Sequence, residues 1–268
     1  MTYRFKKLFA GSNLKMYKSN RQTLAFLRRL QEITQDIPRD RLELFFLPSY
    51  LSLADACRAA DPTLVRIGAQ NMHWEAQGQF TGEISAPMLQ EIGVRLVMVG
   101  HAERRQIFGE TDWMVNKRVH AGLALGFTTL VCVGDTAQDQ EIGASAERLA
   151  LQLKFALHGV EDSRLDQVWV AYEPVWAIGE GAINAPPGFA NEMHAKLHAI
   201  LEELYPEAGK KVPVLYGGSV NLDNAAALVA QPEIDGLFIG RAAWDADQFN
   251  HIIRRSLEAA KLVQPQLT

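Results

Sequence analysis

The most informative segment of the chain is Val168-Trp169-Val170-Ala171-Tyr172-Glu173-Pro174-Val175-Trp176-Ala177-Ile178-Gly179-Glu180-Gly181. It begins with a short apolar run, which is typical of a parallel strand that is buried on both faces. The run ends at one carboxylate, Glu173, and an apolar loop bounded by proline and glycine follows. Because such a loop does not stay in water by itself, we predict a lid beside a base at the mouth of a barrel. The alternative is a solvated glutamate followed by an ordinary turn.

Similar apolar runs recur along the chain and are separated by amphipathic stretches. The predicted strands cover residues 8–11, 42–47, 65–69, 96–100, 128–133, 168–172, 214–216 and 237–240. Helical spacing of apolar residues predicts helices over 23–33, 146–157 and 249–262. Eight strand–helix units about 30 residues apart predict an α/β fold, a single-domain (β/α)₈ TIM barrel over residues 1–268. A doubly wound open sheet is the alternative, but no Gly-x-Gly-x-x-Gly follows the first strand.

Composition and charge restrict the classes of function. The 268 residues are 48% hydrophobic and 22% charged, with a net charge of −4, which is typical of a soluble globular protein. Basic residues are scattered among acidic ones, so we expect no nucleic-acid partner. We also expect no membrane span, because no apolar stretch approaches the roughly 20 residues of a transmembrane helix. Cys57 and Cys132 are far apart and form no Cys-x-x-Cys motif, which favours a reduced, cytoplasmic protein.

Polar residues and glycines follow five of the predicted strands, at the end of a barrel where active sites lie. They are Asn13 and Lys15, His101 and Glu103, Glu173, Gly217-Gly218-Ser219, and Gly240-Arg241. Any one of them could be a framework residue, but together they predict one site. Glycine lets backbone N–H groups converge on an anion, so the last two loops favour phosphate binding over simple tight turns.

These residues stand within longer motifs: Asn13-Leu14-Lys15, Gly100-His101-Ala102-Glu103-Arg104-Arg105, Ala171-Tyr172-Glu173-Pro174-Val175-Trp176-Ala177-Ile178-Gly179 and Tyr216-Gly217-Gly218-Ser219-Val220. The motifs resemble those of the triosephosphate isomerase family and occur in that family's order. The resemblance runs from about Leu8 to Ile253. It implies an enzyme that interconverts dihydroxyacetone phosphate and glyceraldehyde 3-phosphate by proton transfer through an enediolate.

The resemblance also implies a role for each motif residue. Glu173 is the expected base, His101 a neutral hydrogen-bond donor to the enediolate oxygens, and Lys15 a positive charge beside the developing oxyanion. Asn13 and Glu103 are the expected supporting polar residues. The residues expected to contact the phosphate are Gly179, Gly218, Ser219, Gly240 and Arg241.

The resemblance implies neither a metal nor an organic cofactor. The His101-Ala102-Glu103 triplet lacks the Pro-Cys-x-x-Cys partner of a zinc deaminase, and Cys132 is expected to pack rather than to act as a nucleophile. Gln79-Phe80-Thr81-Gly82-Glu83 resembles the family's interdigitating loop. We therefore expect a homodimer in which Thr81 reaches the partner's site, with a small phosphorylated sugar as the other partner.

Several residues near the expected ligand depart from the family's usual pattern: Leu14, Tyr17, Ala102, Glu180, Ala182-Ile183-Asn184 and Arg241. Ala102 replaces a serine that normally holds the base in its resting state, so the resting partner of Glu173 stays open. Arg241 replaces a glycine and would add a charged clamp on phosphate.

Two further segments indicate a second possible substrate. Gly68-Ala69-Gln70-Asn71-Met72-His73-Trp74 and Ile234-Asp235-Gly236-Leu237-Phe238-Ile239-Gly240-Arg241-Ala242-Ala243-Trp244 look like the branch that isomerises tetrulose phosphates in erythritol breakdown. L-erythrulose 1-phosphate ⇌ D-erythrulose 4-phosphate is therefore the alternative reaction. A non-catalytic phosphosugar-binding regulator is the alternative of another class, but it would have lost the base or the electrophile.

Overall fold

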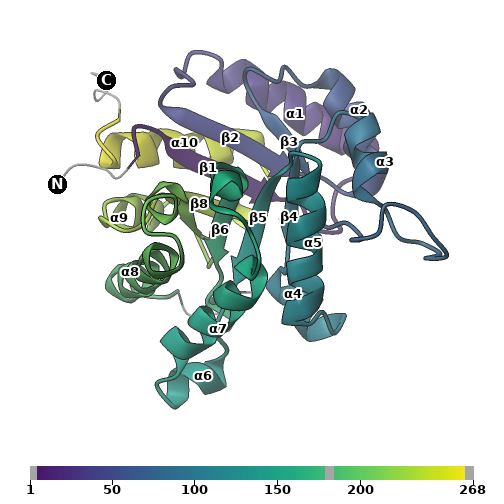
Figure 1. The fold of residues 1–268 in the computed structure, drawn as a ribbon. Helices are drawn as coiled ribbons and strands as arrows, with labels where there is room; N and C mark the ends of the chain where they lie inside the picture. Colours follow the sequence, from purple (N-terminus) through teal and green to yellow (C-terminus); the bar gives the residue numbers. More distant parts are fainter. Residues whose placement is uncertain (1–4, 179–183, 263–268) are drawn as a thin grey trace.

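A computed structural model describes residues 5–178 and 184–262 and shows eight parallel strands closed into a barrel (Figure 1). The strands are β1 (Leu8–Asn13), β2 (Leu42–Leu47), β3 (Arg66–Ala69), β4 (Leu96–Val99), β5 (Thr128–Val133), β6 (Val168–Tyr172), β7 (Val214–Tyr216) and β8 (Gly236–Ile239). Each strand pairs with its neighbours in sequence, and β8 pairs with β1. The predicted (β/α)₈ barrel is thus confirmed.

Helices follow the strands and cover the outside of the barrel (Figure 1). The α-helices are α1 (Asn20–Thr34), α2 (Tyr50–Ala59), α3 (Ala86–Glu91), α4 (Ala102–Ile107), α5 (Asp112–Ala124), α6 (Ala137–Glu141), α7 (Ser145–Leu157), α8 (Pro187–Leu204), α9 (Ala225–Val229) and α10 (Ala246–Ala259). The short 3₁₀ helices are η1 (Asp162–Gln167), η2 (Val175–Ala177), η3 (Gly209–Lys211) and η4 (Arg241–Ala243). Of the described helices, none is long and apolar enough to cross a membrane.

The ends of several elements differ from the predicted ones. Strand β1 extends to Asn13, which pairs with Leu47, so Asn13 is the last residue of the strand rather than a residue after it. Strand β4 stops at Val99, because Gly100 has a φ of 73° and turns the chain into α4. Helix α10 ends at Ala259 rather than at position 262. There Lys261 has a φ of 57° and its N–H donates to the Glu258 carbonyl, which terminates the helix.

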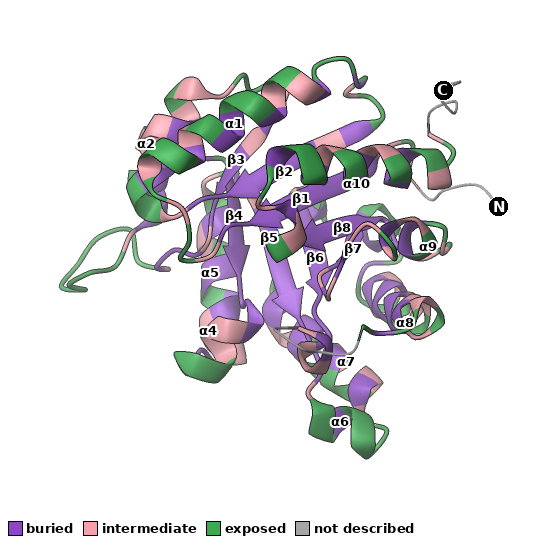
Figure 2. Cartoon of the chain, turned by 180° about the vertical axis from the view of Figure 1, so that it is seen from behind, coloured by how far each residue is buried: buried purple, intermediate pink, exposed green. Residues whose placement is uncertain are grey.

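Two apolar layers hold the barrel together. Successive strand residues point alternately inward and outward, so on β6 Trp169 and Ala171 fill the interior while Val168 and Val170 face the helices. Purple strands and green outer helix faces in Figure 2 show this division. Cys132 belongs to the interior layer, and burial raises the pKa of its thiol well above the usual range. This agrees with the packing role expected for it.

Candidate active site

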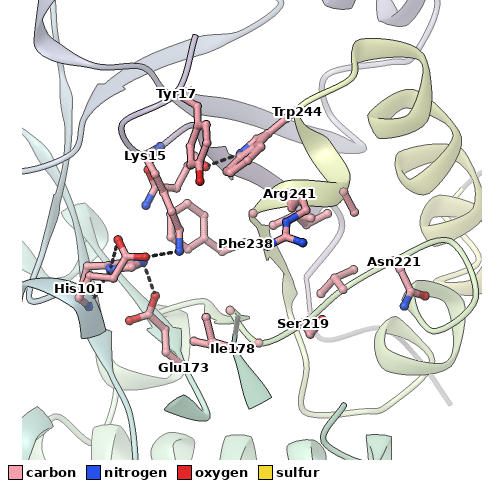
Figure 3. A pocket seen from close by; sticks show the side chains of 18 of the residues that line it. Lys15, Tyr17, His101, Glu173, Ile178, Ser219, Asn221, Phe238, Arg241 and Trp244 are labelled. Atoms are coloured by element: carbon pink, nitrogen blue, oxygen red, sulfur yellow. Dashed lines mark hydrogen bonds and ion pairs between the residues drawn. The ribbon is translucent and has the colours of Figure 1, made fainter. Parts of the chain in front are cut away.

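A pocket of about 550 Å³ lies where the loops after β1, β4, β6, β7 and β8 meet (Figure 3). Ten of the predicted site residues line it: Asn13, Lys15, His101, Glu103, Glu173, Gly217, Gly218, Ser219, Gly240 and Arg241. Gly179 lies outside the described residues. Thr81 is exposed in the loop between β3 and α3 and does not line the pocket.

Glu173 is the first residue after β6, and only 2% of its surface is exposed. Its Oε1 lies 3.1 Å from Nε2 of His101, and its Oε2 accepts a 2.9 Å hydrogen bond from the backbone N–H of Ala102. The sequence left the resting partner of Glu173 open. In the structure its carboxylate contacts two groups, the backbone amide of Ala102 and the imidazole of His101. Gly134 allows this packing, because a Cβ there would lie 2.1 Å from the Glu173 carbonyl oxygen.

His101 is the N-terminal cap of α4, and its orientation fixes its tautomer. Its Nδ1 accepts a 3.2 Å hydrogen bond from the backbone N–H of Glu103. Since a ring nitrogen that accepts a hydrogen bond carries no proton, the proton of the neutral ring is on Nε2. That nitrogen faces Oε1 of Glu173. The imidazole therefore presents an N–H donor to the pocket.

Lys15 adopts a left-handed backbone conformation with a φ of 51°. Such a conformation costs a non-glycine residue about 1–3 kcal/mol, so the surroundings must maintain it. Its backbone N–H donates to Oδ1 of Asn13 at 2.8 Å, and its carbonyl accepts from Nε2 of Gln70 at 2.8 Å. Its ammonium lies 2.5 Å from Oε1 of Glu103. Glu103 thus lies between the ammonium and the imidazole, since its other carboxylate oxygen is 3.7 Å from Nδ1 of His101.

The glycine-containing loops after β7 and β8 form the opposite side of the pocket from Lys15 (Figure 3). Gly218 packs so closely on Tyr216 that a Cβ would lie 2.3 Å from the tyrosine hydroxyl oxygen. Ser219 is fixed by a 2.9 Å hydrogen bond from Nδ2 of Asn224 to its carbonyl. Arg241 is exposed at the start of η4 and adds a positive charge here. This side therefore brings glycines and a cation together, a combination that suits an anion, and a Cβ at Gly240 would meet nothing within 4 Å.

The start of the apolar loop after Glu173 is anchored by a buried carboxylate. Asp135 accepts hydrogen bonds from the indole Nε1 of Trp176 at 3.0 Å and from the hydroxyl of Tyr172 at 2.9 Å. Burial and the neighbouring Asp135 raise the pKa of Tyr172 far above the usual range, so the phenol stays a donor. Ala177 is buried, Val175 and Trp176 are half-buried, and Ile178 lines the pocket, so residues 175–178 are partly withdrawn from water.

Sequence reasoning did not assign some residues of the site to it. Asn221, Phe238, Trp244 and Gln248 line the pocket, and Tyr17 was singled out only as a departure from a pattern. Asn221 and Trp244 follow β7 and β8 closely enough for strand-end reasoning to have found them. Gln248 lies inside α10, where no local signal marks it.

Comparison with known proteins gives consistent results. The family model described as triosephosphate isomerase matches residues 8–256. The L-erythrulose-1-phosphate isomerase of Rhizobium etli is 41% identical over 263 residues, which cover 97% of each chain. The protein of the same name from Mesorhizobium japonicum is 42% identical over 94% of this chain and 98% of its own. The triosephosphate isomerase of Solibacter usitatus is also 42% identical, over 92% of this chain and 98% of its own.

Proposed function

The chain belongs to the triosephosphate isomerase family, and we propose that it interconverts dihydroxyacetone phosphate and glyceraldehyde 3-phosphate through an enediolate. One observation carries this proposal: a buried carboxylate, an imidazole N–H and an ammonium group line the same pocket. A carboxylate can move a proton between adjacent carbons while an N–H donor and an ammonium stabilise the charge on oxygen.

Glu173 is the proposed base. Its carboxylate takes the proton from the carbon next to the carbonyl, and the electron pair of that C–H bond forms the carbon–carbon double bond of the enediolate. The carbonyl electron pair moves to oxygen, where the Nε2–H of His101 and the ammonium of Lys15 stabilise the charge. Glu173 then returns the proton to the neighbouring carbon. The hydroxyl proton of the first carbon passes to the oxygen of the former carbonyl, so the first hydroxyl becomes the new carbonyl and the first carbonyl becomes a hydroxyl. The burial of Glu173 supports this role, because it keeps bulk water away from the carboxylate that removes the proton.

The phosphate group is proposed to bind across the pocket from Lys15. The residues on that side are Gly218, Ser219, Gly240 and Arg241. Gly179 is also proposed to contact the phosphate, although it lies outside the described residues. Asn13 supports the site by holding the Lys15 backbone, and Glu103 by pairing with its ammonium. Arg241→Gly should raise KM for the phosphorylated substrate about tenfold, since charge-assisted bonds contribute more than neutral ones. An unchanged KM would remove Arg241 from the phosphate site.

The second candidate reaction is L-erythrulose 1-phosphate ⇌ D-erythrulose 4-phosphate. This substrate is dihydroxyacetone phosphate with a hydroxymethyl group on the carbon that loses the proton, so the same transfer applies. Two relatives at 41–42% identity carry the corresponding name. In addition, two departures from the family pattern, Tyr17 and Arg241, line this pocket.

A side-by-side assay on the two ketose phosphates tests the proposal. The ratio of the two kcat/KM values identifies the preferred substrate. Activity on neither compound, with binding of both retained, would contradict the proposal and favour the non-catalytic regulator.

We also propose that the protein is a cytoplasmic homodimer. The loop from Glu75 to Glu83 is exposed along its whole length and projects from the barrel (Figure 2). It carries Thr81 and a 42% exposed Phe80. A projecting loop with an exposed aromatic ring fits insertion into a second copy. Sedimentation at micromolar concentration tests this, and a fully active monomer would refute it.

A further inference from the structure

Trp244 connects the two strand-end loops that flank the seam between β1 and β8. The ladder between these strands ends at the pair Ser12 and Ile239. Beyond it, the indole Nε1 of Trp244 donates a 2.9 Å hydrogen bond to the carbonyl of Asn13. Asn13 is 4% exposed, and a buried carbonyl needs a partner. The tryptophan thus extends the connection between the strands past the end of the sheet.

The same indole ring also contacts the other side of the loop after β1. Its ring centroid lies 4.3 Å from that of Tyr17, with an angle of 38° between the planes. Trp244 therefore touches the residues two positions before and two positions after Lys15. Figure 3 shows the two rings side by side on the Lys15 side of the pocket.

The residue held between these contacts, Lys15, has a left-handed backbone conformation. Lys15 has a φ of 51°, and its N–H is bound by the side chain of Asn13, whose carbonyl Trp244 holds. If Asn13 or Tyr17 shifts, the left-handed conformation loses support and the chain can relax. The ammonium would then move relative to His101 and Glu173. A misplacement of about 1 Å can cost a catalytic site about 10² in rate.

We infer that Trp244 is a positioning residue that acts through Lys15, an inference that rests on the proposed function of Lys15. Trp244 is half-buried and its backbone N–H bonds to the carbonyl of Arg241, so it belongs to the loop that lines the phosphate side. It consequently ties the position of the ammonium to the loop that would hold the phosphate.

Graded substitutions test the inference. Trp244→Phe keeps a ring against Tyr17 but loses the donor to Asn13, and should lower kcat about tenfold. Trp244→Leu loses both contacts and should lower kcat about 10². Inhibition by inorganic phosphate should change less than threefold in both variants, because the glycine loops remain. Trp113→Leu is the matched control: this 53% exposed tryptophan of α5 packs on Phe155 and does not line the pocket.

A double-mutant cycle separates positioning from general destabilisation. In a Lys15→Ala background, Trp244→Leu should change the remaining kcat less than twofold, since its effect passes through the missing ammonium. The inference would be overturned if Trp244→Leu lowered kcat about 10² in the Lys15→Ala background as well. It would also be overturned if Trp244→Leu alone left kcat within threefold of the unmodified protein.

A crystal structure of Trp244→Leu gives a readout that does not depend on turnover. We expect the φ of Lys15 to leave the left-handed region and its ammonium to move. An unchanged Lys15 conformation would refute the inference even in an active enzyme. Inactivity of the unmodified protein on both sugar phosphates would instead refute the proposed function, and this structural outcome would still decide the role of Trp244.

Discussion

Trp169 is near the start of β6, and Glu173 follows directly after its end, four residues later. Trp169 belongs to the interior layer of the barrel, and Glu173 lines the pocket at its mouth. Trp169 is held by ring packing against Phe9 and Phe45, with centroids 5.2 and 5.3 Å away. Glu173 is held by two directional contacts, with Ala102 N–H and with His101 Nε2. Packing is distributed over many atoms, whereas a polar contact depends on one partner. The interior layer should therefore determine stability and the mouth should determine chemistry.

The largest expected effect tests the mouth. Glu173→Gln removes the base while keeping its shape, and should lower kcat by about 10²–10⁴. The melting temperature should fall by only a few degrees: the amide oxygen can still accept from Ala102 N–H, whereas the amide NH₂ meets the Nε2–H of His101 and one hydrogen bond is lost. Retention of more than about a tenth of the rate would show that another group removes the proton.

The next effect tests the interior layer. Trp169→Ala should lower the free energy of unfolding by about 3–5 kcal/mol, since it leaves a cavity among aromatic rings. Activity per folded molecule should stay within about threefold of the original. Denaturant titration and an assay normalised to the folded fraction measure the two quantities. A loss of activity without a loss of stability would show instead that this interior residue determines the chemistry.

A buried histidine on the outer layer should make the stability of the protein depend on pH. Burial, with a contribution from His198, lowers the pKa of His194 to about 3. The unfolded chain takes up this proton below about pH 6.5 and the folded chain does not, so stability falls as pH falls. The free energy of unfolding should therefore be about 2 kcal/mol lower at pH 5 than at pH 7 because of this residue. Denaturant titration at both pH values should show that His194→Phe removes this difference and that substitution of the exposed His251 does not.

The smallest effect concerns the resting position of the base. Ala102→Ser would add a hydroxyl beside the amide that holds Oε2 of Glu173. One further hydrogen bond contributes about 1 kcal/mol, so kcat should fall less than about fivefold. A loss above about twentyfold would mean that the side chain at this position blocks the substrate.

The sequence predicted most of this architecture for a physical reason. Strands buried on both faces leave continuous apolar runs, so β2, β5, β6 and β7 have the predicted bounds. Strand-end reasoning likewise placed Lys15, His101 and Glu173 at one rim. The five-residue α6 was missed, because one turn and a half is too short to show a period.

Contacts between distant residues could not be predicted in the same way. The hydrogen bond from Trp244 to Asn13 spans 231 positions, and the bond from Ala102 to Glu173 spans 71. Each depends on strand register and on the direction of one side chain, which a local pattern does not contain. Asp135 was missed for this reason as well: its three donors come from β6, η2 and α7.

The seam between β1 and β8 has a consequence for synthesis on the ribosome. Phe9 pairs with Gly236, so one edge of the first strand has no partner until nearly the whole chain has emerged. That interval is roughly 10–50 s at the 5–20 residues per second typical of translation. During it the nascent chain exposes unpaired backbone groups that invite association with other chains. Stalled chains that end before Gly236 should therefore bind chaperones more strongly than complete ones.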